Sequence, residues 1–352
     1  MDLAKSETPV ILKELLPQEV MELLAGWGFK SFRAQQLLKW IYVRQAEDFE
    51  QMTDISKADR ALLAQRCKIG LLIVLGRDKA SDGTQKLLLG LEDGLRIESV
   101  IIPEEDHFTQ CISTQVGCSM GCAFCRTSSL SRKRNLRTWE MVDQVVTGRR
   151  LMQEGRIRNV VLMGMGEPLA NYNSVLKAIR IMLDPKALDL SKRRVTLSTC
   201  GLVPELRKLA SEGLDIGLAV SLNATTEAQR SSLMPINRKY PLGLLLETCR
   251  ELELPPRNRV TFEYVLLDGV NDSLEDARRL VKLLRGIRCK VNLIPHNPYP
   301  GSPFKRPSQE RILAFQKLLS DSGLTCPIRW SHGSDIWAAC GQLAGGDPRA
   351  EG

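Results

Sequence analysis

The sequence has few histidines and no long apolar segment. Its only histidines are His107, His296 and His332, too few to indicate a metal site built from three imidazoles. No apolar run approaches the roughly 20 residues that a bilayer-spanning helix needs. No positively charged segment followed by an apolar one opens the chain, as a secretory signal would. We therefore expect a cytoplasmic protein without a membrane segment.

Cysteine is too rare for a disulfide scaffold, with 10 residues in a chain of 352. Three of them stand close together, Cys118, Cys122 and Cys125, in the spacing C-x3-C-x2-C. This spacing can place three thiolates on a 4Fe-4S cluster and leave its fourth iron open to a small molecule. In a long chain that molecule is usually S-adenosylmethionine. The alternatives are a structural zinc site, which would need a fourth ligand nearby, and unrelated buried thiols.

Positive charge exceeds negative charge and gathers after the cysteine motif. The chain has 49 Lys and Arg against 41 Asp and Glu, a net charge of +8. The cations that follow the motif are Arg126, Arg132, Lys133, Arg134, Arg137, Arg149, Arg150, Arg156, Arg158, Lys192, Arg193 and Arg194. Cations beside an active site would indicate phosphate contacts and a polyanionic partner. The alternative, of equal weight, is a set of solvated helix ends and loops.

Two periodicities divide the first part of the chain. Apolar residues at three- and four-residue spacing predict helices at 16–24, 32–43 and 57–67, so residues 1–70 should form a helical accessory domain. Short apolar runs at 70–75, 86–91 and 95–102 are separated by Asp-Gly pairs that favour tight turns. We expect residues 71–107 to form antiparallel strands that lead into the main domain.

Strands and helices alternate from residue 108 onward. Strands are predicted at 110–115, 160–165, 195–199, 216–222, 260–267 and 291–295, and helices at 141–152, 174–182, 204–210, 242–252 and 274–284. This order predicts a parallel sheet covered by helices. Six strands are too few for a complete eight-stranded barrel, so the fold class is α/β, a partial (β/α)6 barrel over residues 108–343 with its chemistry at the carboxyl ends of the strands. Residues 344–352 should form a flexible tail.

Polar residues stand at several predicted strand ends. Gly166 would let the backbone approach a ligand, and the adjacent Glu167 carboxylate can bind an ammonium group such as that of a methionyl moiety. The side chains of Ser198, Ser221, Asn223 and Asn297 can bind a carboxylate or a ribose. Taken singly, each of these residues is more often a turn or capping residue.

Five ordered motifs resemble the RlmN/Cfr family of radical S-adenosylmethionine RNA methyltransferases, over nearly the whole chain. They are the cysteine motif, Gly164-Met-Gly-Glu-Pro-Leu169, Leu197-Ser-Thr-Cys-Gly-Leu-Val-Pro204, Met234-Pro-Ile-Asn-Arg-Lys-Tyr-Pro241 and the segment from Asp335 to Leu343. Two N-terminal segments, 32–42 and 49–54, resemble the RlmN members in particular.

The resemblance implies an enzyme that methylates carbon 2 of an adenosine in large-subunit ribosomal RNA and, in some members, in transfer RNA. It implies a 4Fe-4S cluster, two S-adenosylmethionine molecules per turnover, an external one-electron reductant and an N-terminal domain that binds RNA. The open iron would hold the S-adenosylmethionine that is cleaved to a 5′-deoxyadenosyl radical. We expect a monomer.

The resemblance also assigns roles to residues. Cys340 would take a methyl group as a thiolate, and its methylene radical would then add to the adenine and crosslink protein to RNA. Attack by Cys111 on the Cys340 sulfur would release the product and leave a disulfide. Either Cys111 or Glu98 would accept the ring proton. Contacts to S-adenosylmethionine are implied for Gly166, Glu167, Ser198, Ser221, Leu222, Asn223 and Asn297.

The chain departs from the family pattern at three places. The segment 126–134 is more basic than usual, Asn223 stands where many members have histidine, and Cys200 replaces a small or hydroxyl residue. Two alternatives stay open. A Cfr-like member would methylate carbon 8 of the same adenosine, and a non-enzymatic zinc protein that binds RNA would also account for the charge and the thiols.

Overall fold

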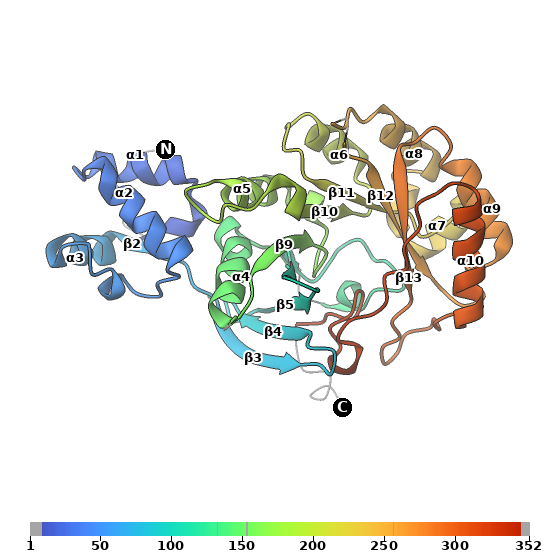
Figure 1. The fold of residues 1–352 in the computed structure, drawn as a ribbon, viewed down its shortest axis with the longest axis horizontal. Helices are drawn as coiled ribbons and strands as arrows, with labels where there is room; N and C mark the ends of the chain where they lie inside the picture. Colours follow the sequence, from blue (N-terminus) through green and yellow to red (C-terminus); the bar gives the residue numbers. More distant parts are fainter. Residues whose placement is uncertain (1–8, 132, 153, 256, 346–352) are drawn as a thin grey trace.

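The computed structural model describes residues 9–131, 133–152, 154–255 and 257–345. Its centre is a nine-stranded sheet in the order β13-β12-β11-β10-β9-β6-β5-β4-β3 (Figure 1). The six strands that run parallel to their neighbours are β6 (Phe108–Cys111), β9 (Ile157–Leu162), β10 (Val195–Thr199), β11 (Gly217–Ser221), β12 (Val260–Leu266) and β13 (Cys289–Pro295). The predicted α/β fold with six parallel barrel strands is confirmed.

Helices cover the outer face of this curved sheet (Figure 1). They are α4 (Thr138–Leu151), α5 (Tyr172–Leu183), α6 (Val203–Ala210), α7 (Glu227–Leu233), α8 (Leu242–Glu251), α9 (Leu274–Leu283) and α10 (Gln309–Asp321). Five of the seven match predicted helices within a few residues, whereas α7 and α10 were not predicted. The short α7 begins after Thr226, whose side chain accepts a hydrogen bond from the Gln229 N–H group and so caps the helix.

The antiparallel strands belong to the same sheet. They are β3 (Ile73–Lys79), β4 (Gln85–Gly90) and β5 (Arg96–Pro103), and β5 pairs antiparallel with the first barrel strand, β6. Gly83 and Gly94 have φ angles of 83° and 78° in the two predicted Asp-Gly turns, a conformation that favours glycine. The predicted strands therefore form a continuation of the barrel sheet. The strand β3 begins three residues later than predicted, because Gly70 has a φ of 85° and the Leu72 N–H is bonded to the Asp143 carboxylate and not to a neighbouring strand.

The N-terminal part is helical, as predicted. Its elements are β1 (Val10–Ile11), α1 (Pro17–Gly26), α2 (Ser31–Leu38) with a π-helical turn (Lys39–Val43), α3 (Lys57–Arg66) and β2 (Cys67–Lys68), with short 3-10 turns at Leu12–Glu14 and Phe49–Gln51. These helices lie beside α4 and α5 in Figure 1. The proposed boundaries between domains stay a prediction.

A buried ion pair joins this N-terminal part to the barrel. The Lys13 ammonium donates to the Asp143 carboxylate of α4 and to the Gly70 carbonyl at 3.0 Å, and both charged side chains are fully buried. The second Asp143 oxygen accepts the Leu72 N–H at 2.7 Å. One carboxylate therefore fixes the start of the chain and the segment before β3 to the same helix.

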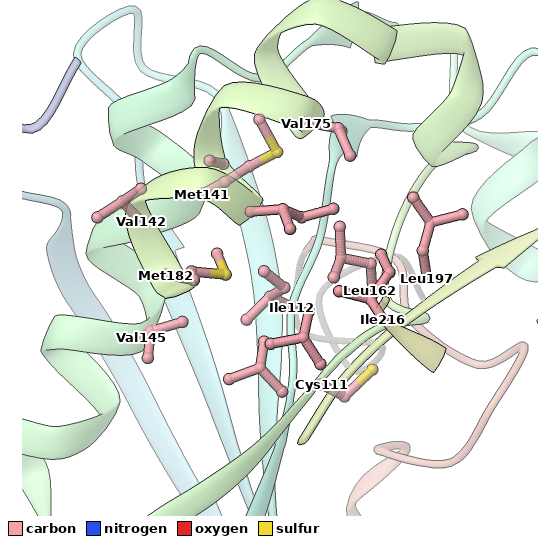
Figure 2. Packing of buried hydrophobic residues seen from close by; sticks show 14 of the residues in the cluster. Cys111, Ile112, Met141, Val142, Val145, Leu162, Val175, Met182, Leu197 and Ile216 are labelled. Atoms are coloured by element: carbon pink, nitrogen blue, oxygen red, sulfur yellow. The ribbon is translucent and has the colours of Figure 1, made fainter. Parts of the chain in front are cut away.

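The core lies between the sheet and helices α4 and α5. Figure 2 shows Met141, Val142 and Val145 of α4 facing Val175 and Met182 of α5, all of them buried. Ile112, just after β6, packs among them, whereas Cys111 lies at the edge of the group (Figure 2). Side chains alternate across a strand, so Cys111 and Ile112 face opposite sides of the sheet.

Within the described residues, none of the helices is both long and apolar enough to cross a bilayer.

The predicted flexible tail is only partly described. Residues 346–352 lie outside the described residues, and Ala344 is held by a 2.7 Å hydrogen bond from its N–H to Glu98 Oε2.

We predict that Lys13→Met lowers the free energy of unfolding by about 3–5 kcal/mol, because it leaves the buried Asp143 carboxylate without its cation. Urea denaturation measures the change. Lys317→Met is the control, since its pair with Asp321 is exposed and should contribute less than about 1 kcal/mol. Equal losses in the two variants would show that the buried pair does not hold the N-terminal part in place.

Candidate active site

One cavity opens at the carboxyl ends of the barrel strands, and we call it the strand-end cavity. Its lining includes Cys118, Cys122, Cys125, Gly164, Gly166, Glu167, Ser198, Cys200, Ser221, Asn223, Glu263, His296, Asn297 and Cys340. The residues come from the ends of four parallel strands, from the loop after β9 and from the distant C-terminal segment. The structure thus brings together most of the residues predicted to bind a cofactor.

The three motif cysteines occupy a single loop between the short strands β7 (Gln115–Val116) and β8 (Arg134–Asn135). The loop is folded on itself, because the Ser128 hydroxyl donates to the carbonyls of Cys122 and Cys125 at 2.9 and 2.7 Å. Burial raises the pKa of the Cys118 thiol to about 11, and the charges of Cys118 and Cys125 add to the rise in the pKa of Cys122. The three thiols therefore lie near one another, facing one cavity.

This arrangement fits an iron-sulfur cube. Among the described residues, no three His, Cys, Asp or Glu side chains converge closely enough to hold one metal ion. A cube does not require that convergence, because it binds each of the three thiolates through a different iron. The rest of the cavity, with its polar strand ends, adjoins the thiols where a ligand of the fourth iron would lie.

Glu167 is buried beside these cysteines. Its Oε1 accepts the Leu169 N–H at 3.0 Å and its Oε2 accepts the Cys200 N–H at 2.7 Å. Burial raises the pKa of this carboxyl group, and the two N–H groups oppose the rise. A cationic ligand in the cavity would favour the ionised form further, as expected of a residue that binds an ammonium group.

The other residues predicted to contact S-adenosylmethionine differ in how far they are open to the strand-end cavity. Ser198, Ser221 and Asn297 line the cavity. Asn223 also lines it, but its Oδ1 accepts the Val265 N–H at 2.8 Å, so the amide braces the strand ends as well. Leu222 is fully buried and is not part of the lining. Any contact from Leu222 to a cofactor would have to come from its backbone.

Cys340 reaches the cavity because the C-terminal segment is fastened beside the cysteine loop. The Arg126 N–H donates to the Gly341 carbonyl at 2.8 Å, and the Thr127 hydroxyl donates to the Leu343 carbonyl at 2.7 Å. The Asn297 amide donates to the carbonyl of Cys340 itself at 3.1 Å. Residues more than 200 positions apart are thereby held in contact.

A second cavity, which we call the lateral cavity, adjoins the first. Cys111 and Cys340 both line it, together with Glu263, Asn297, Arg329 and Trp330. Cys340 is exposed because it opens into both cavities, whereas Cys111 is buried, and both are free thiols. Although Cys340 is exposed to the cavities, the protein around both thiols removes them from bulk water and raises the pKa of each, that of Cys340 to about 11. The Cys340 charge raises the pKa of Cys111 further. The two thiols therefore share one site.

Glu98 lies outside both cavities. It is buried, its Oε1 is 3.4 Å from the Lys86 ammonium, and its Oε2 accepts the Ala344 N–H. The structure thus places the predicted proton acceptor beneath the end of the C-terminal segment, where it helps to hold that segment.

Several residues of the site were not predicted. Glu263 of β12 and His296 after β13 line the strand-end cavity, and burial together with Arg306 lowers the pKa of His296 to about 4, so its imidazole is neutral. Arg230 of α7 is fully buried and donates to the Cys200 carbonyl at 2.8 Å and to Asn237 Oδ1 at 3.0 Å. No periodic signal distinguishes these residues: Glu263 and His296 stand within or beside mainly apolar strands, and Arg230 stands among the polar residues of α7.

The basic segment after the cysteines is partly neutralised. Arg134 binds Glu140 and Asp93, and Arg137, Arg150 and Arg158 each pair with a carboxylate. Arg132 lies outside the described residues. For these four arginines, the ion pairs offset part of the local positive charge, and contacts with phosphate stay a prediction.

Comparisons with known proteins agree with this geometry. A family model described as the radical SAM superfamily matches residues 112–282, and one described as the ribosomal RNA large subunit methyltransferase N-terminal domain matches residues 11–69. The dual-specificity RNA methyltransferase RlmN of Syntrophobacter fumaroxidans is 51% identical over 95% of this chain and 98% of its own length. That of Pelobacter propionicus is 52% identical over 95% of each. The chain belongs to the RlmN family of radical S-adenosylmethionine methyltransferases.

A solved structure extends the likeness to the whole RlmN fold. The crystal structure of a radical SAM methyltransferase from Sphaerobacter thermophilus superposes with a TM-score of 0.93 at 44% identity, covering 96% of this chain and all of the other. The chain is therefore an enzyme, and its cofactors are a 4Fe-4S cluster and S-adenosylmethionine. The alternative of a non-enzymatic zinc protein is wrong.

Gly166 gives a test of the cavity's shape. It has a φ of 103°, and a Cβ added there would lie 2.5 Å from Gln115 Cβ and 2.8 Å from the Gln115 nitrogen. Because both strain and overlap oppose it, Gly166→Ala should lower the free energy of unfolding by at least about 2 kcal/mol and abolish S-adenosylmethionine binding. Denaturation and equilibrium dialysis with the reconstituted protein measure the two effects.

Gly213→Ala is the matched control. Gly213 also has a positive φ, 64°, but nothing lies within 4 Å of its added Cβ. Its substitution should cost only about 1–2 kcal/mol and leave cofactor binding intact. If the two variants bind the cofactor equally well, Gly166 is not at the binding surface.

Proposed function

We propose that this enzyme methylates carbon 2 of an adenosine in large-subunit ribosomal RNA and of an adenosine in transfer RNA. The observation that carries the proposal is the pair of thiols, Cys111 and Cys340, lining one cavity that adjoins the strand-end cavity. The name of the relatives, dual-specificity RNA methyltransferase, supports two kinds of RNA substrate.

The cofactors would occupy the strand-end cavity. Cys118, Cys122 and Cys125 would hold the cluster, and Gly166, Glu167, Ser198, Ser221, Asn223 and Asn297 would hold S-adenosylmethionine, with Leu222 contributing through its backbone. When bound, the two cofactors supply the methyl group and the radical that activates it. A radical route is needed because carbon 2 of adenine is electron-poor and does not displace a methyl group from a sulfonium.

Cys340 is the residue that carries the methyl group to the RNA. Cys340 lines both the strand-end cavity, where the cofactors would bind, and the lateral cavity, where the adenosine would bind. After the carbon on Cys340 has bonded to adenine, Cys111 is placed to attack the Cys340 sulfur and release the methylated RNA, leaving a disulfide. Both thiols line the lateral cavity, which supports this pairing.

Cys111 also accounts better than Glu98 for removal of the ring proton. Cys111 lines the lateral cavity, whereas Glu98 is paired with Lys86 and with the Ala344 N–H. We therefore assign proton acceptance to the thiolate form of Cys111, which must first lose its own proton because burial raises the pKa of this thiol. Glu98 has the role of holding the C-terminal segment in place.

Three further parts of the proposal concern partners and location. The helical N-terminal domain, residues 1–70, binds RNA; an external one-electron reductant serves the cluster; and the enzyme acts as a cytoplasmic monomer. The family model that matches residues 11–69 supports the first of these. A Cfr-like reaction at carbon 8 is less well supported, since the relatives compared above are RlmN proteins.

We predict that Cys340→Ala abolishes RNA methylation, because no other thiol lies at the junction of the two cavities among the described residues. Cys111→Ala should instead accumulate protein crosslinked to RNA. Mass spectrometry of nucleosides and gel analysis of the crosslink measure these outcomes. The two isomers have the same mass, so chromatographic retention times against authentic standards separate methylation at carbon 2 from methylation at carbon 8. Cys289→Ala, at a thiol outside both cavities, should keep full activity. Methylation by the Cys340 variant at the wild-type level would rule out the proposal.

A further inference from the structure

Glu263 lies where three cavities meet. It belongs to β12 and lines the strand-end cavity, the lateral cavity and a third cavity at the amino ends of the strands. This third cavity, which we call the cationic cavity, is lined by Arg193, Arg257, Arg259, Lys290 and Arg329. Among the described residues, Glu263 is the one carboxylate that all three cavities share. Neither the motifs nor the mechanism above uses it.

Methylation of Cys340 requires a group that accepts the proton of its thiol. Burial raises the pKa of the Cys340 thiol to about 11, so the sulfur carries its proton at neutral pH. The proton must leave as the sulfur is alkylated. Cys340 lines the strand-end and lateral cavities, the spaces that cofactor and RNA would fill. An acceptor inside the protein is therefore needed when the site is occupied.

Other nearby carboxylates are already engaged. Glu167 uses both oxygens for backbone N–H groups, and Glu98 lies outside the cavities. Glu104 lines the lateral cavity but not the strand-end cavity, and it accepts a 2.8 Å hydrogen bond from Thr109. Glu263 shares both cavities with Cys340, and apart from burial its charge is the main influence that raises the pKa of that thiol. Among these carboxylates, Glu263 therefore has the strongest electrostatic influence on the Cys340 sulfur.

The surroundings of Glu263 suit a carboxyl group that gains a proton. Asn292 Nδ2 donates to Glu263 Oε1 at 2.9 Å, while Asn292 Oδ1 is buried and has no hydrogen-bond partner among the described residues. A protonated carboxyl group pairs with an amide through two hydrogen bonds, one in each direction, so the unpartnered Oδ1 is an acceptor for that proton. Burial raises the pKa of Glu263, whereas Asn292, Arg329 and Lys290 lower it. On balance the pKa of Glu263 is raised, which favours uptake of a proton by this carboxyl group.

We propose that Glu263 accepts the proton that leaves Cys340 when its sulfur is methylated. The inference rests on the proposed role of Cys340. A carbon–sulfur bond forms at Cys340, the carbon–sulfur bond of the sulfonium donor breaks, and the thiol proton passes to Glu263 with no change of oxidation state. The protonated carboxyl group then donates to Asn292 Oδ1. Release to solvent follows through the cationic cavity, which Glu263 also lines.

The test uses Glu263→Gln, which keeps the shape of the side chain but accepts no proton. Reconstituted protein is incubated with S-adenosylmethionine carrying a deuterated methyl group, without RNA or reductant, and the label on Cys340 is followed by mass spectrometry between pH 6 and 9. At neutral pH the variant should methylate Cys340 roughly 10²–10⁴-fold more slowly, the range that general base catalysis contributes. Glu263→Asp, which keeps a carboxylate, should recover part of the rate.

A second measurement separates proton acceptance from a simple charge effect. The pH profile of iodoacetamide labelling at Cys340, taken without cofactors, should move to lower pH in Glu263→Gln, because the negative charge that raises the pKa of the thiol is gone. If Glu263 acted only through its charge, the variant would then also methylate faster at neutral pH. A lower thiol pKa together with slower methylation is the result that supports the proposal.

Two outcomes would overturn the inference, and a third concerns the proposed function. Wild-type methylation rates in Glu263→Gln, or rates equal to those of the surface control Glu251→Gln, exclude Glu263 as the acceptor. Unfolding curves show whether Glu263→Gln folds. If Glu263→Gln does not fold, the comparison moves to Glu263→Asp and Glu263→Ala. Equal methylation rates in those two variants would also exclude Glu263 as the proton acceptor. An absence of label on Cys340 in the wild-type protein overturns the proposed function itself, and the inference with it.

Discussion

The attachment of the C-terminal segment to the cysteine loop is the constraint on which the site depends. Backbone and hydroxyl groups of residues 126 and 127 bind the carbonyls of residues 341 and 343, and Asn297 holds the carbonyl of Cys340. Each such hydrogen bond contributes only about 1 kcal/mol, so several are needed to hold a segment without regular secondary structure. Their combined effect sets Cys340 at the boundary between two cavities, and without them the thiol would have no fixed relation to the cluster loop.

The sheet supplies the second thiol. Cys111 ends β6, the strand at which the parallel barrel changes to the antiparallel extension, and its neighbour Ile112 packs against α4 and α5. The extension adds β5, whose Glu98 accepts the Ala344 N–H, so the same strands that border Cys111 also hold the segment that carries Cys340. Continuity of the nine-stranded sheet therefore brings the two thiols into one cavity, which a separate strand linker would not do.

Most strands and helices could be predicted from the sequence where the hydrophobic pattern was strong, whereas elements with a weak pattern were missed. The boundaries of β10 were predicted without error because Val195 and Leu197 alternate with hydroxyl residues between the basic residues 192–194 and the turn at Gly201. By contrast, α7 has only seven residues and too few turns for a periodic signal. In the site, the cysteines and Glu167 belong to motifs and were found. Glu263 and His296 were missed because a single polar residue in or beside a buried strand has meaning only when the cavity it faces is known. Glu98 was predicted as a proton acceptor through the family resemblance alone, and its contacts with Lys86 and the Ala344 N–H could not be read from the sequence.

Burial has one chemical consequence throughout the site. It raises the pKa of each motif cysteine and of Cys111, Cys340 and Cys200, so in the absence of cations these thiols hold their protons. Binding of iron must displace protons from three of them, since thiolates are the ligands, and the positive charge of the metal drives that release. No metal binds Cys340, so its proton needs a different acceptor in the same low-dielectric space. A buried carboxyl group with an unpartnered amide oxygen beside it is the kind of group that can hold such a proton, because there it stays hydrogen-bonded whether charged or neutral.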